Sequence, residues 1–219
     1  EPQDVQIDPA EVEYLCNTVN RYFTRKLAPQ DVVWSYSGIR PLLDDKSGDP
    51  SSVTRDYKLE MERSHAPLLS VFGGKITTYR KLAETAVNQL SRALGSPRPA
   101  WTATAFLPGG KLPGGSLARF LRTVERQYPW LPASLRTRYS RSYGTRIHKL
   151  LQGTRGMVDL GEEVLPGVFE GEIDYLQREE WAQTAQDILW RRSKLGLHLP
   201  PSATDTLDEW LRKRSAGTH

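Results

Sequence analysis

The chain has 219 residues, of which 38% are hydrophobic and 26% are charged. This composition is ordinary for a globular protein and excludes a chain that is disordered as a whole. No apolar run approaches the ~18 residues of a membrane-spanning helix, and no signal peptide is visible. The single cysteine, Cys16, excludes an internal disulfide and favours a reducing compartment. The first residue is not Met, which favours a fragment or a processed form.

The net charge of +4 is unevenly distributed along the chain. Residues 111–155, called the basic segment below, contain ten basic residues and a single acidic one, Glu125. Such a segment can contact phospholipid headgroups, nucleic acid or an acidic partner. The alternative interpretation is a solvated helix surface that is rich in arginine.

The first predicted element is a helix that begins at Asp8 and ends near Leu27. Asp8 can cap the helix, Pro9 suits its first position, and Glu11 can complete a capping box. We interpret Cys16 as a small core residue rather than a reactive thiol. Apolar residues recur along one face of this helix: Val12, Leu15, Cys16, Val19, Tyr22 and Phe23.

Two strands are predicted next, over residues 32–43 and 53–61, from their β-branched and aromatic content and from their alternation. Arg40 and Arg55 fall on the apolar faces of these strands. A buried guanidinium without an anion is costly. The two arginines therefore either pair with internal carboxylates or form a site for a phosphate or a carboxylate.

The central predicted unit is a buried strand over residues 68–72, a turn and a long amphipathic helix over residues 79–94. Gly73 and Gly74 allow the tight turn. Thr77 or Thr78 is expected to cap the helix, because either hydroxyl can accept a hydrogen bond from a first-turn N–H group.

The start of this helix favours an anion, because its first N–H groups lack internal partners and Lys75 adds a positive charge. The alternative is a plain strand-to-helix connection with a solvated lysine. The segment matches neither the Walker loop nor the GxGxxG pattern of a dinucleotide-binding fold.

Residues 95–99 form a predicted linker, and two LPGG segments after it are predicted turns. From Ser116 onward the pattern is helical, and we expect a small helical bundle. Trp181, Trp190 and Trp210 are interpreted as core and interface residues. Trp181 is expected at the start of a helix that is either separate from the preceding one or continuous with it. The scattered histidines and the lone cysteine give no spacing typical of a metal site.

Several ordered motifs carry a resemblance to a known family. They are SYSGIRPLLDD, TRDY and SVFGGKITTYRKLAE, followed by LPGG, YG and WAQTAQDILWRRSKLGL. Together they resemble the C-terminal part of bacterial FAD-dependent (aerobic, respiratory) glycerol-3-phosphate dehydrogenases, over nearly all of the chain. The N-terminal half of that family, with its glycine-rich Rossmann segment, has no counterpart in this sequence.

The resemblance implies an α+β fold: the end of an FAD- and substrate-binding α/β region over residues 1–96, then an all-α C-terminal helical domain over residues 97–219. It implies oxidation of sn-glycerol 3-phosphate to dihydroxyacetone phosphate. Arg40 and Arg55 match family positions that bind the substrate, chiefly its phosphate. The FAD-binding positions that match, Lys75 among them as the expected catalytic residue, are Gly73, Gly74, Lys75, Ile76 and Thr77.

The resemblance also implies electron transfer from FAD to a membrane quinone, with cytoplasmic protein attached peripherally to the inner membrane face. The basic segment is one candidate for that contact. A homodimer is compatible with the resemblance, and no nucleic-acid partner is expected. The resemblance implies that the base that accepts the hydroxyl proton and the Rossmann segment that holds the ADP part of FAD both lie in the N-terminal half. The chain alone is therefore expected to be inactive and colourless.

Two other functions remain open at this stage. The chain could be a basic helical module that binds nucleic acid or an acidic partner. It could also belong to another flavin oxidase of the same superfamily that acts on an amine, although two inward arginines argue against that substrate.

Overall fold

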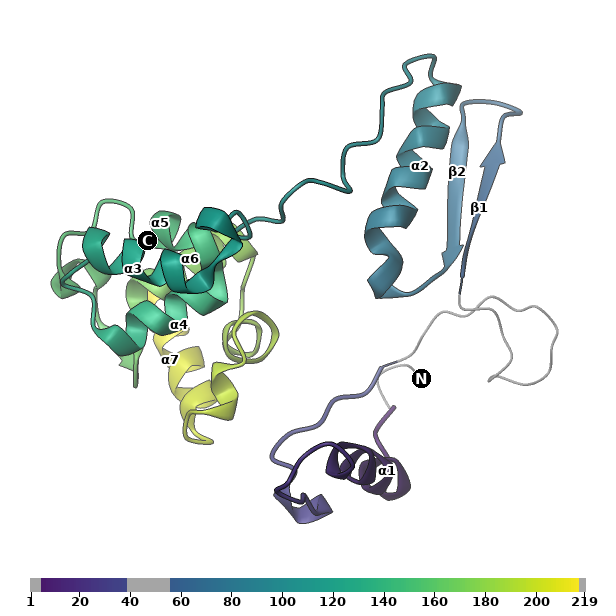
Figure 1. Ribbon diagram of the computed structural model, residues 1–219. Coiled ribbons are helices and arrows are strands. Elements are labelled where there is room, and N and C mark those ends of the chain that lie inside the picture. The colour runs from purple at the N-terminus through teal and green to yellow at the C-terminus, as the bar shows by residue number, and fades with distance from the viewer. Residues whose placement is uncertain (1–4, 39–55, 217–219) are drawn as a thin grey trace. The chain divides into compact units, whose positions relative to one another are not determined.

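The computed structural model describes residues 5–38 and 56–216 (Figure 1). The chain divides into two compact units, Glu1–Ala105 and Phe106–His219. The domains predicted over residues 1–96 and 97–219 stay a prediction. Among the described residues, no helix is both long and apolar enough to cross a membrane.

Helix α1 (Pro9–Asn20) begins as predicted, with a complete capping box between Asp8 and Glu11. It ends well before the predicted end near Leu27. The reason is a pair of hydrogen bonds from the Asn20 side chain: Nδ2 donates to the Leu27 carbonyl at 2.9 Å, and Oδ1 accepts from the Leu27 N–H at 2.8 Å. These bonds fold residues 21–27 back onto the helix end. Cys16 is buried, as predicted.

The strand predicted over residues 32–43 is wrong over its described part. A 3₁₀ turn (Pro29–Asp31) is followed by irregular backbone through Gly38, and the remainder of the prediction lies outside the described residues. The rings of Trp34 and Tyr36 still pack together, with centroids 5.2 Å apart. A strand requires a neighbour to pair with, and no described strand pairs with this segment.

Strands β1 (Tyr57–Glu62) and β2 (Leu68–Gly73) form an antiparallel hairpin in which Tyr57 pairs with Gly73. The predicted alternation of β1 is confirmed, because Tyr57, Leu59 and Met61 are half-buried between exposed neighbours. The expected burial of β2 is wrong: Leu68, for example, is 57% exposed. A two-stranded sheet offers little area on which to bury side chains.

Helix α2 (Tyr79–Ala93) follows the hairpin and lies beside it (Figure 1). Its span agrees with the helix predicted over residues 79–94. The Tyr57 hydroxyl on β1 and the Thr85 hydroxyl on α2 lie 3.5 Å apart, which ties the helix to the hairpin.

The second unit is the predicted helical bundle. Its buried core includes Phe120, Tyr139, Ile147, Ile173 and Leu207, which come from all of its longer helices. The helices are α3 (Leu117–Gln127), α4 (Ala133–Tyr143), α5 (Ile147–Leu150), α6 (Glu170–Glu180), a π-helical segment (Asp187–Arg192) and α7 (Ala203–Ala216).

A small hairpin in the second unit was not predicted. It joins β3 (Glu163–Leu165) to β4 (Val168–Phe169) through a turn in which Gly167 has a φ of +73°. Strands of three and two residues are too short to show the alternation from which a strand is predicted.

The interpretation of Trp181 as a core residue is wrong. Trp181 ends α6 in the left-handed conformation, with a φ of 56°, and its side chain is 80% exposed. This turn also separates α6 from the π-helical segment, so the two are not one continuous helix. Trp190 and Trp210 do pack against the core while partly buried, as predicted.

Candidate functional site

The predicted site lies where β2 turns into α2. Gly73 and Gly74 both have positive φ angles, +68° and +96°. A Cβ atom on Gly74 would lie 3.2 Å from the Cβ of Tyr57 and 3.5 Å from Cδ1 of Leu82. The turn therefore requires glycine twice over, for its backbone angles and for its close packing against β1 and α2.

A single 3₁₀ turn (Ile76–Thr78) connects the glycines to the helix, and it changes the expected cap. The Lys75 carbonyl accepts hydrogen bonds from the Thr78 N–H at 2.9 Å and from the Thr78 hydroxyl at 2.8 Å. Because this hydroxyl is a donor, the prediction that a threonine side chain caps α2 is wrong. In place of a side-chain cap, the carbonyls of Lys75 and Ile76 accept hydrogen bonds from the N–H groups of Thr78 and Tyr79.

The residues at this turn, Lys75, Ile76 and Thr77, are exposed. Within the described ranges, no hydrogen-bond partner is present for the N–H groups of Lys75, Ile76 and Thr77. The Lys75 side chain is exposed, and Ile76 is 88% exposed. Three N–H donors without a described partner, an ammonium group and one exposed apolar side chain thus occur within three consecutive residues. This set suits the electronegative edge of a flat ligand.

Arg40 and Arg55, the predicted phosphate ligands, lie outside the described residues. Their convergence on the glycine turn stays a prediction. Tyr57, which is two positions after Arg55 in the sequence, pairs with Gly73 of that turn.

A polar cluster on α2 was not anticipated from the sequence. The Glu84 carboxylate accepts hydrogen bonds from Lys81 at 2.7 Å, Thr102 at 2.9 Å and Arg80 at 3.1 Å. The bonds from Lys81 and Thr102 are the main reasons that the pKa of Glu84 is lowered. Through Thr102 the cluster ties the segment beyond the predicted linker back to α2, beside a hollow of about 430 Å³ that includes Trp101.

The second unit contains a fully buried carboxylate, Glu172 of α6. Arg138 of α4 binds both of its oxygens, at 2.6 and 2.7 Å, and the Tyr143 hydroxyl donates to it at 2.6 Å. Burial, and then the charge of Glu172, raise the pKa of Tyr143 well above its usual value. Arg138 also donates to the carbonyl of Gly167 at 2.6 Å. These groups join α4, α6 and the β3–β4 hairpin, which is a structural role.

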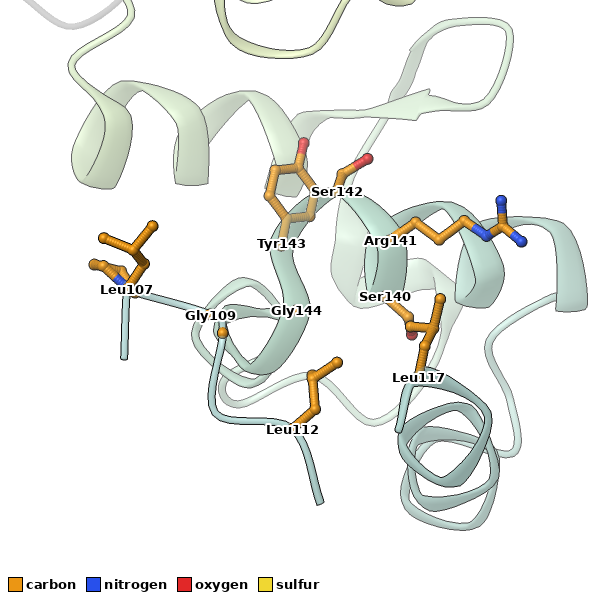
Figure 2. A pocket seen from close by; sticks show the side chains of 11 residues that line it. Leu107, Gly109, Leu112, Leu117, Ser140, Arg141, Ser142, Tyr143 and Gly144 are labelled. Carbon is orange, nitrogen blue, oxygen red and sulfur yellow. The ribbon is translucent and has the colours of Figure 1, made fainter. Parts of the chain in front are cut away.

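An open hollow of about 610 Å³ lies at the end of α4 (Figure 2). The first LPGG motif forms one wall, and there the Gly109 carbonyl accepts a hydrogen bond from the Thr145 N–H at 3.0 Å. A Cβ on Gly144 would lie 2.1 Å from the Gly109 oxygen, and one on Gly109 would lie 2.4 Å from the Tyr143 oxygen. The LPGG and YG motifs therefore fit against each other as a structural pair.

Three leucines, Pro108 and three glycines make up much of the lining of this hollow. Figure 2 shows Leu107 and Leu112 on one side and Leu117 on the other, while Arg141 extends from α4 away from Gly109. Its polar side chains are those of Arg141, Tyr143 and two serines, and the hydroxyl of Ser140 is buried without a hydrogen-bond partner among the described residues.

Comparison with known proteins gives matches over nearly the whole chain. Residues 100–212 match the family described as the C-terminal domain of alpha-glycerophosphate oxidase. The chain is 48% identical over 214 residues to a glycerol-3-phosphate dehydrogenase of Pseudomonas aeruginosa. It is 43% identical over 213 residues to an aerobic glycerol-3-phosphate dehydrogenase of Escherichia coli. It is 44% identical over 209 residues to a D-erythritol 1-phosphate dehydrogenase of Brucella abortus.

These alignments cover 97%, 96% and 95% of this chain, respectively. They cover only 42% of each relative. The chain therefore spans about two-fifths of the length of the curated relatives that it matches.

Proposed function

Since the chain belongs to the family of the C-terminal domain of alpha-glycerophosphate oxidase, we propose that it is the C-terminal part of a flavoprotein that oxidises sn-glycerol 3-phosphate to dihydroxyacetone phosphate. The observation that carries this proposal is the similarity to glycerol-3-phosphate dehydrogenases across 97% and 96% of the chain. The alignment extends through both units, so it includes the glycine turn as well as the bundle.

Arg40 and Arg55 are proposed to bind the phosphate of the substrate. Each guanidinium presents a planar pair of N–H donors that matches two phosphate oxygens. A phosphate dianion would compensate the two positive charges of these side chains. The binding energy gained on the phosphate holds the substrate in place, while the reaction occurs at its secondary alcohol.

The turn from Gly73 to Thr77 is proposed to hold the pyrimidine end of FAD. The fit rests on the N–H groups of Lys75, Ile76 and Thr77, which have no described partner, and on the missing Cβ of Gly74, which leaves the backbone accessible. FAD held there would supply the acceptor for the hydride that leaves the carbinol carbon of the substrate. Lys75 would stabilise negative charge at the pyrimidine edge, because preorganised donors and cations lower the energy of charge that develops during a reaction.

The electrons are proposed to leave through a membrane quinone, with the protein attached peripherally to the inner face of the membrane. The acceptor of the hydroxyl proton is proposed to lie outside this chain. The chain would then contribute the substrate phosphate site, one edge of the flavin site and the helical bundle.

A test of the phosphate site uses the full-length protein with Arg55→Ala. We expect the KM for glycerol 3-phosphate to rise about 10- to 100-fold, because hydrogen bonds to a charged group are lost, while the flavin content stays the same. Arg63→Ala, an exposed arginine outside the proposed site, is the control and should leave the KM unchanged. An unchanged KM in Arg55→Ala would refute the phosphate role.

A second candidate substrate is D-erythritol 1-phosphate. It is favoured by the 44% identity to the Brucella abortus dehydrogenase, which is as high as the identity to the Escherichia coli enzyme. Both substrates carry a phosphate, so Arg55→Ala should weaken both. The ratio of kcat/KM for the two compounds in the parent protein decides between them.

A further inference from the structure

The hollow at the end of α4 contains a hydroxyl group that the fold leaves unused. Ser140 of α4 is only 2% exposed, and its Oγ has no hydrogen-bond partner among the described residues. Ser140 lines the hollow, and Figure 2 shows its side chain on the same side as Leu117. A buried polar group without a partner lowers the stability of a folded protein. A ligand that supplied the missing partner would therefore gain binding energy from it.

The same hollow has a positive charge at its rim. Arg141 lines it, is exposed, and forms no ion pair or hydrogen bond with a described residue. No Asp or Glu occurs among the described residues that line the hollow, so its chemistry favours an anion. Four other cations of the basic segment, residues 111–155, are instead paired with acids: Arg136 with Glu125, Arg138 with Glu172, and Arg146 and Lys149 with Glu179.

Much of the remaining lining is apolar or has no side chain. Leu107 and Leu112 lie on one side and Leu117 on the other (Figure 2), and Leu107 is 65% exposed. The hydroxyl of Tyr143 is already donated to Glu172. The volume of about 610 Å³ is in the range of roughly 300–1,000 Å³ that is usual for small-molecule sites. The lining thus combines an apolar surface with a few free polar groups on α4.

We propose that this hollow is a binding site for a medium-chain aliphatic carboxylate. The carboxylate lies beside α4, where it accepts hydrogen bonds from the Ser140 hydroxyl and from the Arg141 guanidinium, whose exposed side chain can turn toward it. Since the Ser140 hydroxyl is shielded from solvent, Leu117 on the same side of the hollow rotates to admit the carboxylate. The aliphatic chain crosses the hollow and covers Leu107 and Leu112.

Two other kinds of occupant fit the lining less well. A phosphate dianion carries two negative charges, whereas the lining supplies one guanidinium, that of Arg141. A peptide brings a polar N–H and C=O group with every residue, and each needs a partner when it is buried. A ligand with one charged end and an otherwise apolar body matches the few free polar groups of the hollow. The proposal goes beyond the proposed function and does not rest on it.

The test is equilibrium dialysis of the 219-residue chain against radiolabelled octanoate. We expect one molecule to bind with a Kd of about 0.1–1 mM, because a ligand of about ten non-hydrogen atoms gains limited free energy at an open site. Butanoate should bind at least about 10-fold more weakly, since it buries less apolar surface. Octanol, which has the same chain without the carboxylate, should also bind about 10-fold more weakly.

Variants of the lining test each part of the site. Arg141→Gln should weaken octanoate binding about 10-fold and leave octanol binding unchanged. Arg126→Gln is the charge-matched control, because it removes an exposed cation of α3 that does not line the hollow, and it should leave octanoate binding nearly unchanged. Leu107→Ala shortens an exposed apolar side chain and should weaken both ligands about 3- to 10-fold.

Ser140→Ala separates a binding role of the hydroxyl from a structural one. It should weaken octanoate binding about 10-fold. In the absence of octanoate it should raise the melting temperature by about 2–4 °C, because a buried hydroxyl without a partner is removed. A lower melting temperature together with unchanged octanoate binding would show that the hydroxyl is structural, and would overturn the proposal.

Four further results would overturn the proposal: no octanoate binding at about 10 mM, equal binding of octanoate and octanol, equal weakening by Arg141→Gln and Arg126→Gln, or tighter binding of octyl phosphate or of a leucine-terminated peptide than of octanoate. The last result would assign the hollow to a phosphorylated ligand or to a protein partner. None of these measurements involves flavin or turnover, so a failure to oxidise glycerol 3-phosphate would refute the proposed function without affecting them.

Discussion

Glu172 is a fully buried acid of the second unit, and its negative charge is compensated by Arg138. Its carboxylate is fully buried, and its partners, Arg138 and Tyr143, both come from α4. Such a pair adds little stability over an apolar core, but removal of one partner leaves an uncompensated charge in the interior. The pair is therefore costly to break, whatever its own net contribution.

We expect Glu172→Gln to lower the free energy of unfolding by about 3–5 kcal/mol, because Arg138 then stays charged without its carboxylate. Urea unfolding followed by circular dichroism measures the change. Glu209→Gln is the matched control: it breaks an exposed pair with Lys213 on α7, and exposed pairs contribute little. Equal losses in the two variants would contradict the role assigned to Glu172.

The ion pair between Arg138 and Glu172 could not be predicted from the sequence. Arg138 and Glu172 are 34 positions apart, and no spacing rule links them. The basic segment therefore looked uniformly unpaired in the sequence, although α6 supplies partners for several of its cations. The glycine turn at Gly73 and Gly74 was predicted because its signal is local. The joint position of Arg40 and Arg55 depends on distant contacts and stays a prediction.

At the scale of elements, helices with a strong apolar periodicity were predicted well. α2 lies close to its predicted span, and α3 and α4 fall in the region predicted to be helical from Ser116 onward, because local spacing identifies such helices. The prediction was wrong where the structure of a segment depends on a group that is distant in the sequence. A strand over residues 32–38 lacks a described partner, and the end of α1 depends on the bond between Asn20 and Leu27.

Gly144, at the end of α4, packs against Gly109 of the first LPGG motif, and we expect this contact to require glycine. Gly144→Ala should destabilise the protein by about 2–4 kcal/mol, because its Cβ would meet the backbone oxygen of Gly109 and its φ of +52° is strained for alanine. Gly153→Ala is the control, with a φ of +83° and open space around its Cβ, and should cost about 1 kcal/mol. Thermal unfolding compares them. Similar losses would mean that backbone strain alone matters and that the clash does not.

At the scale of the whole molecule, the chain covers 42% of the Pseudomonas aeruginosa and Escherichia coli relatives and contains no GxGxxG segment. The glycine turn would contact only one end of FAD. We therefore expect the 219-residue chain, purified alone, to be colourless, while the full-length protein is yellow. Absorbance in the flavin bands, scaled to protein concentration, measures the difference. A yellow chain with one flavin per molecule would show that the chain alone is sufficient to bind the cofactor.

The contact between Gly109 and Gly144 also constrains how this protein can diverge. A Cβ on Gly144 would meet the backbone oxygen of Gly109, and a Cβ on Gly109 would meet the backbone oxygen of Tyr143, so a smaller neighbouring side chain cannot rescue either position. Most buried contacts allow a large and a small residue to exchange places over evolutionary time. The contact between Gly109 and Gly144 has no smaller residue to exchange. Substitutions in the second unit should therefore be found at positions with open surroundings, such as Gly153, and not at these two glycines.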